Sequence, residues 1–289
     1  MKLVLIHGRS QEGKNPVQLQ QQWETALKKG LSSAGLTWPT NVQIAFPFYG
    51  DKLDELLKEL DAPLIEDVMQ RGAAQDTAEA QFRGDLLYEI ARNAGISDAD
   101  IQAYYSGQPQ EKGPLNWEWV QSILKALDKT PLGEAAIDAF TRDVYVYLTN
   151  KAVRRVIDGL VSPYLTEGSC VVVGHSLGSV VGYNVLSKTA QNVSANRYVT
   201  VGSPLGLKAI KRQLDTPLAM PPCTKKWYNA MDERDVVALY PLDIENFPIQ
   251  PPIENKTNVD NHTDNRHGIE GYLDDPEVAR SIYMALMVV

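Results

Sequence analysis

Cysteine is scarce in this sequence. Only two of the 289 residues are cysteines, so no disulfide framework is expected. Cys170 opens an apolar run typical of a buried strand, where a reduced thiol packs as a small hydrophobic group. No apolar run approaches the roughly 18 residues of a membrane-spanning helix, and the start MKLVLIHGRSQ lacks the pattern of a secretory signal. We therefore expect a cytoplasmic protein with no transmembrane segment.

An excess of positive charge is also absent. The sequence has 28 Lys and Arg against 36 Asp and Glu, a formal net charge of −8. A chain without a basic field does not gather phosphate backbones, so nucleic acid is not an expected partner. The metal-binding patterns H-E-x-x-H and C-x-x-C do not occur, and the His- and Asp-rich residues 260–267 fit a polar loop better than a defined site. We predict neither a metal nor a cofactor.

What the sequence does contain is an alternation of strand-like and helix-like segments. Residues 2–6 predict a strand, residues 16–34 a helix with Asn15 as its N-cap, and residues 41–46 a second strand parallel to the first. The later predicted elements are strands 169–174, 196–202 and 225–231, helices 177–189 and 207–214, a Pro- and Asn-rich loop of about 35 residues, and a helix beginning at Pro276. This order predicts one α/β domain over residues 1–289, with a mostly parallel central sheet flanked by helices.

Helical patterns replace strand patterns between Phe48 and about Leu165. The predicted helices include residues 77–95, 117–129 and 132–165, the last broken near Asn150. This block is too long for an ordinary crossover between two strands. We therefore predict a helical cap, inserted into the α/β core at about residues 50–130. Its acidic side chains indicate a solvated helical surface.

The sequence Gly174-His175-Ser176-Leu177-Gly178 fits the pattern G-x-S-x-G. It lies where an apolar strand gives way to a helix, which is the setting of a nucleophile elbow. On such a turn the serine hydroxyl is exposed and the helix N-terminus favours developing negative charge. A phosphate-binding turn is the alternative, but the segment has neither G-x-G-x-x-G nor the lysine of a P-loop. Ser176 is the candidate nucleophile.

A nucleophilic serine needs a histidine base and an acid that orients it. Of the four histidines, His7 and His175 belong to glycine turns, which leaves His262 and His267 before the last helix. We favour His267, which is nearer that helix, and retain His262 as the alternative base. Asp232 and Asp235, just after strand 225–231, are the candidate acids, and either gives the chain order Ser, Asp, His that the elbow fold uses.

The turn after the first strand supplies a further candidate element. His7-Gly8 is followed by Arg9, and a turn at this place can offer a backbone N–H to an oxyanion. We predict that the N–H groups of Arg9 and Leu177 form the oxyanion hole.

These motifs together resemble the α/β-hydrolase superfamily, in its lipase and esterase branch. The resemblance rests on IHG (6–8), VVVGHSLGS (171–179), TVGSPLG (200–206), DVVALYPL (235–242) and HGIEGYL (267–273). It implies an α/β-hydrolase fold whose usual N-terminal edge hairpin is absent. It also implies that Asp235, rather than Asp232, is the acid, and that a serine ester hydrolase forms an acyl-enzyme on Ser176. The expected substrate is a small-molecule or lipid ester.

Two other functions remain open at this stage. A peptidase or a thioesterase would use the same three residues. A hydrolase-like regulatory or binding module would instead dock a protein partner through residues 50–130.

Overall fold

The central feature of the protein is a six-stranded sheet in which every neighbouring pair of strands is parallel. The computed structural model describes residues 1–71, 77–105, 117–128, 130, 133–189 and 192–288, with the side chains of 61–71, 77, 117 and 118 outside the description. The strand order is β2-β1-β3-β4-β5-β6. The strands are β1 (Lys2–Ile6), β2 (Gln43–Ala45), β3 (Gly168–His175), β4 (Val193–Val201), β5 (Trp227–Ala230) and β6 (Glu254–Lys256). The predicted α/β class with helices around a parallel sheet is confirmed.

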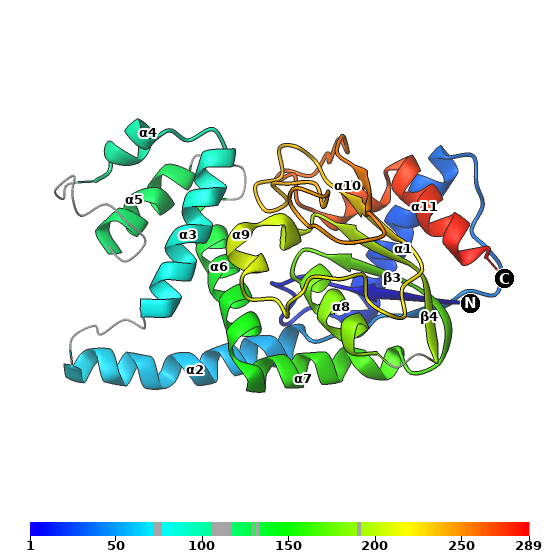
Figure 1. Cartoon of the computed structure of the whole chain (residues 1–289), viewed down its shortest axis with the longest axis horizontal. Helices are drawn as coiled ribbons and strands as arrows, with labels where there is room; N and C mark the ends of the chain where they lie inside the picture. Colours follow the sequence, from blue (N-terminus) through cyan, green and yellow to red (C-terminus); the bar gives the residue numbers. More distant parts are fainter. Residues whose placement is uncertain (72–76, 106–116, 129, 131–132, 190–191, 289) are drawn as a thin grey trace.

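Helices cover both faces of this sheet and extend beyond its carboxyl edge (Figure 1). The α-helices are α1 (Pro16–Ser33), α2 (Gly50–Arg71), α3 (Thr77–Asn93), α4 (Asp98–Gln102), α5 (Trp117–Leu127), α6 (Glu134–Thr149), α7 (Lys151–Val161), α8 (Leu177–Lys188), α9 (Lys208–Lys211), α10 (Ile269–Leu273) and α11 (Pro276–Leu286). Short 3-10 turns occupy Ser162–Tyr164 and Pro204–Gly206. In the part of the chain described, no helix combines the length and apolar character needed to cross a bilayer.

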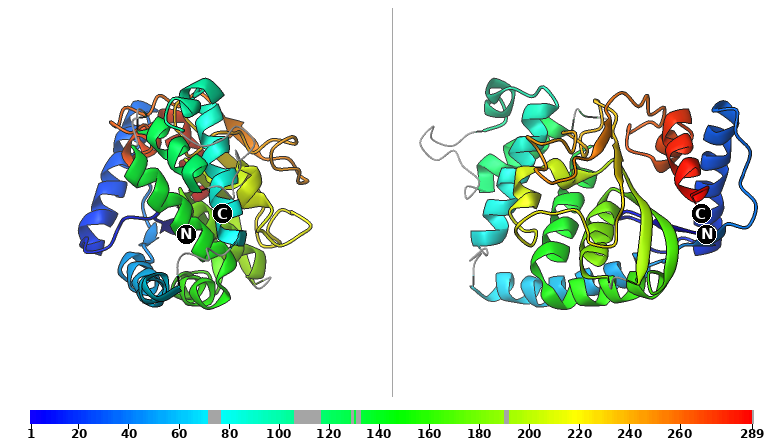
Figure 2. Two further views of the ribbon diagram at one scale, coloured as in Figure 1. Left: turned by 90° about the vertical axis from the view of Figure 1, so that its left-hand side faces the viewer. Right: turned by 45° about the vertical axis from the view of Figure 1, so that its right-hand side comes forward.

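The alternation of side chains along the strands divides the core into two layers. Leu3 and Leu5 of β1 pack with α1, α10 and α11 on one face, whereas Val4 and Ile6 pack with α7 and α8 on the other. Successive residues of a strand point to opposite faces, so both faces of this apolar strand are buried. Figure 2 shows α1 and α11 side by side near the two chain ends, and α2 beside α7 along the base.

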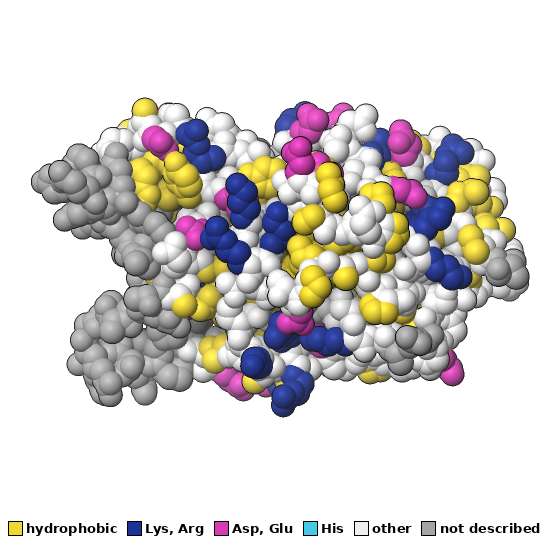
Figure 3. Space-filling view, in the orientation of Figure 1, with side chains coloured by type: hydrophobic (Ala, Val, Ile, Leu, Met, Phe, Trp, Pro, Cys, Tyr) yellow, Lys and Arg dark blue, Asp and Glu magenta, His cyan; other side chains and the backbone are white. Residues whose placement is uncertain are grey.

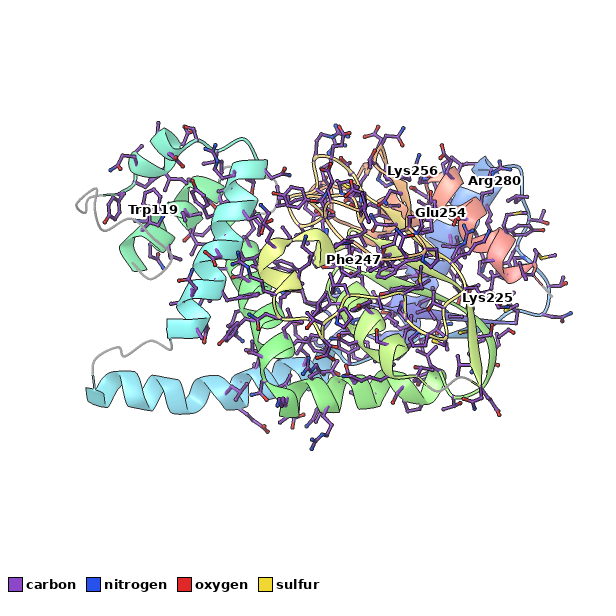
Figure 4. All side chains as sticks on the ribbon, viewed as in Figure 1. Trp119, Lys225, Phe247, Glu254, Lys256 and Arg280 are labelled. Atoms are coloured by element: carbon purple, nitrogen blue, oxygen red, sulfur yellow. The ribbon has the colours of Figure 1, made fainter. Side chains whose placement is uncertain are left out.

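The helices between β2 and β3 form the largest departure from a simple α/β alternation. In Figures 1 and 4, α3, α4 and α5 form a group beyond the carboxyl ends of the strands, with the labelled Trp119 far from Phe247 of the sheet region. Trp119 packs edge-on against Tyr105 within this group, with ring centroids 5.3 Å apart. Residues 72–76 and 106–116 of the predicted cap lie outside the described residues. Leu53 and Leu57 of α2 join the core, so the first turns of α2 belong to the α/β body.

One element was predicted wrongly. The Pro- and Asn-rich segment before the last helices contains β6, which pairs with β5 in the register Tyr228 to Glu254 and Ala230 to Lys256. The three residues of β6 are Glu, Asn and Lys, so they carry no apolar alternation. Their pairing is a property of the backbone, which a hydrophobic pattern does not report.

Candidate active site

Ser176 lies at the junction of β3 and α8 in a strained backbone conformation, with φ 52° and ψ −128°. A positive φ is uncommon for a residue other than glycine, and it persists only where the surroundings enforce it. The neighbouring glycines allow this close packing. A Cβ at Gly174 would lie 2.8 Å from the carbonyl oxygen of Gly178, and one at Gly178 would lie 2.3 Å from that of His7. The sequence therefore folds into the sharp strand-turn-helix that G-x-S-x-G predicted.

Asp235 and His267 are joined by a hydrogen bond of 2.7 Å between Oδ2 and Nδ1. The same carboxylate oxygen accepts a 2.6 Å hydrogen bond from the Tyr272 hydroxyl, and Oδ1 accepts one of 2.9 Å from the Val237 N–H. Burial opposes ionisation of Asp235, but the attraction of His267 and these hydrogen bonds outweigh it and lower the pKa of the carboxyl. A buried carboxylate at this place keeps the His267 ring in one orientation.

His175 holds the backbone of His267 from the other side. Its Nε2 lies 2.8 Å from the His267 carbonyl oxygen, which can only accept, so Nε2 carries the proton. The two rings lie 4.8 Å apart between centroids. Burial lowers the pKa of His175 to about 3, with the neighbouring His267 adding to the effect. A neutral His175 therefore donates to the loop of His267 at neutral pH.

A cavity of about 400 Å³ opens over these residues. Ser176, His267 and the Arg9 turn line it together, and Phe140 of α6 closes one side. The prediction that this turn exposes the serine hydroxyl is wrong: Ser176 is buried, because the Gly8 turn packs against it. Within the part of the chain that the structure describes, the Oγ of Ser176 has no hydrogen-bond partner, so no Ser176–His267 hydrogen bond is formed. The structure thus places the predicted nucleophile and base on one cavity and joins the base to the predicted acid.

The turn after β1 lies against Ser176. A Cβ at Gly8 would be 2.9 Å from the Cβ of Ser176, so only glycine allows this approach. No described group accepts a hydrogen bond from the N–H of Arg9 or of Leu177. Both N–H groups flank the serine, and their role as an oxyanion hole stays a prediction.

Buried polar contacts fix the conformation of this turn. The N–H of Tyr49 donates to Nε2 of His7 at 3.0 Å, and Nδ1 of His7 lies 2.7 Å from the Gly8 carbonyl, which makes Nδ1 the protonated nitrogen. Burial lowers the pKa of His7 to about 4. Arg9 donates from Nε to Asp143 of α6 at 2.6 Å. The turn is thereby tied both to α2 and to α6.

The two alternative residues do not lie on the cavity. Asp232 accepts hydrogen bonds from the N–H groups of Arg234 at 2.8 Å and Asn261 at 2.9 Å, so it anchors the loop that leads to His267. His262 is exposed and its Nε2 lies 2.8 Å from the Asp274 carboxylate. Asp235 does not line the cavity either, and what distinguishes it from Asp232 is its hydrogen bond to Nδ1 of His267.

Sequence reasoning missed Tyr272 and Asp143, which contact the acid and the oxyanion turn. Tyr272 lies in the HGIEGYL segment, five residues after His267, and its hydroxyl is buried against Asp235. An aromatic residue in a short helix beside the base was the available signal. Asp143 lies inside a helical pattern and gave no signal.

Among the described residues, no cluster of His, Cys, Asp and Glu could hold a metal ion.

The chain was compared with family models, curated proteins and solved structures, and none of the three comparisons gave a match.

Proposed function

We propose that this protein is a serine hydrolase of the α/β-hydrolase type that cleaves carboxylic esters. The observation that carries the proposal is the hydrogen bond between Asp235 and His267 on the same cavity as Ser176 at its strained turn. The parallel sheet and the order of the three residues along the chain are compatible with this fold.

In the proposed reaction, Oγ of Ser176 attacks the acyl carbonyl while Nε2 of His267 takes its proton. The imidazolium then gives this proton to the leaving alcohol, and an acyl-enzyme remains on Ser176. A water molecule then attacks the acyl-enzyme, with His267 again taking and returning the proton, and the carboxylic acid product is released. Asp235 holds the ring through Nδ1–H, and the N–H groups of Leu177 and Arg9 stabilise the oxyanion.

The cavity favours an ester with a short acyl group. Its volume of about 400 Å³ is near the lower end of ligand pockets, and its lining includes Gln11, Gln22 and Asn265 beside Trp23 and Phe140. Amide side chains at the wall suit polar substituents on the substrate better than a long alkyl chain. Within the lipase and esterase branch, these features support an esterase.

A fluorophosphonate probe tests the chemistry, because it reacts covalently only with an activated serine. We expect wild type to be labelled, Ser176→Ala to be unlabelled, and His267→Ala to lose at least about a hundredfold in labelling rate. His262→Ala is the matched control and should be labelled like wild type, since His262 lies outside the cavity. Equal labelling of wild type and Ser176→Ala would rule the proposal out.

A further inference from the structure

A second groove lies away from the candidate active site, between α7 and the C-terminal end of α8. Its volume is about 920 Å³. Three cationic side chains of α7 line it, and we call Lys151, Arg154 and Arg155 the α7 cations. Lys188 and Asp158 also line it. Figure 3 shows Lys and Arg side chains along the lower edge of the molecule, where Figure 1 places α7 and α8. This local charge is opposite in sign to the net charge of −8 of the whole chain.

The carboxylate that lines this groove, Asp158, attracts Arg154 electrostatically but forms no ion pair with the α7 cations among the described residues. Asp158 accepts a 2.7 Å hydrogen bond from the Tyr147 hydroxyl through Oδ1, and its Oδ2 lies 3.4 Å from Nζ of Lys188. Both oxygens therefore have other partners. Over the residues that the structure describes, none of the α7 cations forms an ion pair with a carboxylate. Among the described residues, the α7 cations thus lack an ion-pair partner, although Asp158 attracts Arg154 at longer range.

The position of Lys151 at the start of α7 is unfavourable for the helix itself. α7 begins at Lys151, its first turn has no acidic residue, and Asn150 caps it through hydrogen bonds of 3.0 and 3.1 Å to the N–H groups of Ala152 and Val153. A helix N-terminus carries a partial positive charge and favours acidic side chains nearby. Lys151 at this position is better explained by an anion that binds from outside than by the stability of α7.

Gly159, one turn further along α7, leaves the groove open. A Cβ built at Gly159 would meet no heavy atom within 4 Å, so no packing contact requires glycine. Glycine within a helix is less favourable than alanine or leucine. Any larger side chain at this position would stand in the groove, which is otherwise walled by the buried Leu165 and Val185. The glycine thus preserves the space that the α7 cations face.

We propose that the groove between α7 and α8 binds a phosphate-bearing ligand through Arg154, Arg155 and Lys151. The planar guanidinium groups of arginine match pairs of phosphate oxygens, and their charge is retained at every physiological pH. The shared chemistry is a phosphate group with more than one negative charge, which either a soluble phosphate ester or a lipid headgroup supplies. The site is independent of the proposed hydrolase activity, because none of its lining residues lies on the active-site cavity.

Calorimetric titration with inorganic tripolyphosphate tests the site in the full-length protein. We expect saturable binding to wild type and a loss of at least about a hundredfold in affinity in Arg154→Glu/Arg155→Glu, because two charge-assisted contacts are reversed. Gly159→Leu keeps the cations but fills the groove, and it should abolish binding as well. Lys208→Glu/Arg212→Glu, at the first residue and the C-cap of α9, is the matched control: it makes the same change in net charge outside the groove and should bind like wild type.

Vesicles distinguish the two sources of the phosphate. Wild type and the same variants are sedimented with vesicles of phosphatidylcholine alone and of phosphatidylcholine and phosphatidic acid in equal parts. Binding to the acidic vesicles that requires Arg154, Arg155 and an open groove identifies a lipid headgroup, and groove-dependent binding of tripolyphosphate alone identifies a soluble ligand. The proposal is overturned if wild type binds neither probe, if Gly159→Leu binds like wild type, or if the α9 variant loses as much affinity as the arginine variant. Circular dichroism verifies folding, and Gly159→Leu decides the question if the arginine variant does not fold.

Discussion

At the scale of single residues, the candidate site combines contacts between sequence neighbours with contacts between residues far apart in the sequence. The turn at Ser176 could be predicted because its glycines and serine are adjacent in the sequence and their chemistry is local. The hydroxyl of Tyr272 reaches Asp235 across 37 residues, and Arg9 reaches Asp143 across 134. These contacts depend on the tertiary structure, and no local sequence pattern predicts them. The geometry of the turn at Ser176 was therefore predictable, whereas the contacts of Tyr272 with Asp235 and of Asp143 with Arg9 were not.

The partly buried His175 gives the free energy of unfolding of the protein a dependence on pH. Burial lowers the pKa of His175 from 6.5 to about 3, so the unfolded chain binds more protons than the folded one between these values. The contribution of the neutral His175 to the free energy of unfolding is complete above the pKa of His175 in the unfolded chain. It is lost as the pH falls toward the pKa of His175 in the folded protein, by about 1.4 kcal/mol per pH unit for one group. His175→Gln keeps a donor for the His267 carbonyl but does not titrate. In urea unfolding between pH of about 6 and 4, the free energy of unfolding should depend less steeply on pH in this variant than in wild type. An unchanged slope would contradict the neutral state of His175.

At the scale of elements, two helix boundaries could be predicted from their capping residues. Asn15 caps α1 as predicted, and Asn150 both ends α6 and caps α7, which accounts for the predicted break in the long helical pattern. The cap signal is local because the side chain bonds to N–H groups two and three residues away. β6 lacked any such signal, since its partner β5 lies far earlier in the chain.

Two glycines within helices are expected to respond in opposite ways to alanine. A Cβ at Gly30 of α1 would lie 2.4 Å from the carbonyl oxygen of Leu273, whereas one at Gly159 of α7 would meet open space. Gly159→Ala should raise the free energy of unfolding by up to about 1 kcal/mol through helix propensity. Gly30→Ala should lower it by roughly 1–3 kcal/mol, because α1 must move away from α10. Denaturant unfolding of the two variants beside wild type measures both changes, and stabilisation by Gly30→Ala would refute the close helix contact.

At the scale of the whole molecule, composition was a poor guide to the surface. The net charge of −8 excluded a general basic field, yet the fold gathers Lys151, Arg154, Arg155 and Lys188 around one groove. The sequence also indicated a helical insertion without indicating where it would lie. Its position beyond the carboxyl edge of the sheet follows from the packing of α3 on α6 and α9, which depends on side chains distant in sequence.

The volume of the active-site cavity predicts which esters the proposed hydrolase prefers. We expect kcat/KM for p-nitrophenyl butyrate to exceed that for the palmitate by at least about tenfold, because a long acyl chain exceeds a cavity of about 400 Å³. Phe140→Ala removes a side chain from the cavity wall and should reduce the ratio of kcat/KM for the butyrate to that for the palmitate. Ser176→Ala gives the background rate for each ester. A wild-type preference for the palmitate would show that the acyl group binds elsewhere.

The two edge strands have a consequence for how copies of this protein can associate. β2 and β6 contain three residues each, and β6 carries Glu254 and Lys256. An edge so short and charged offers few free backbone groups to a strand from another molecule. Growth of the sheet from one copy into the next is therefore disfavoured, which protects the apolar stretches of β1 and β3 from ordered aggregation.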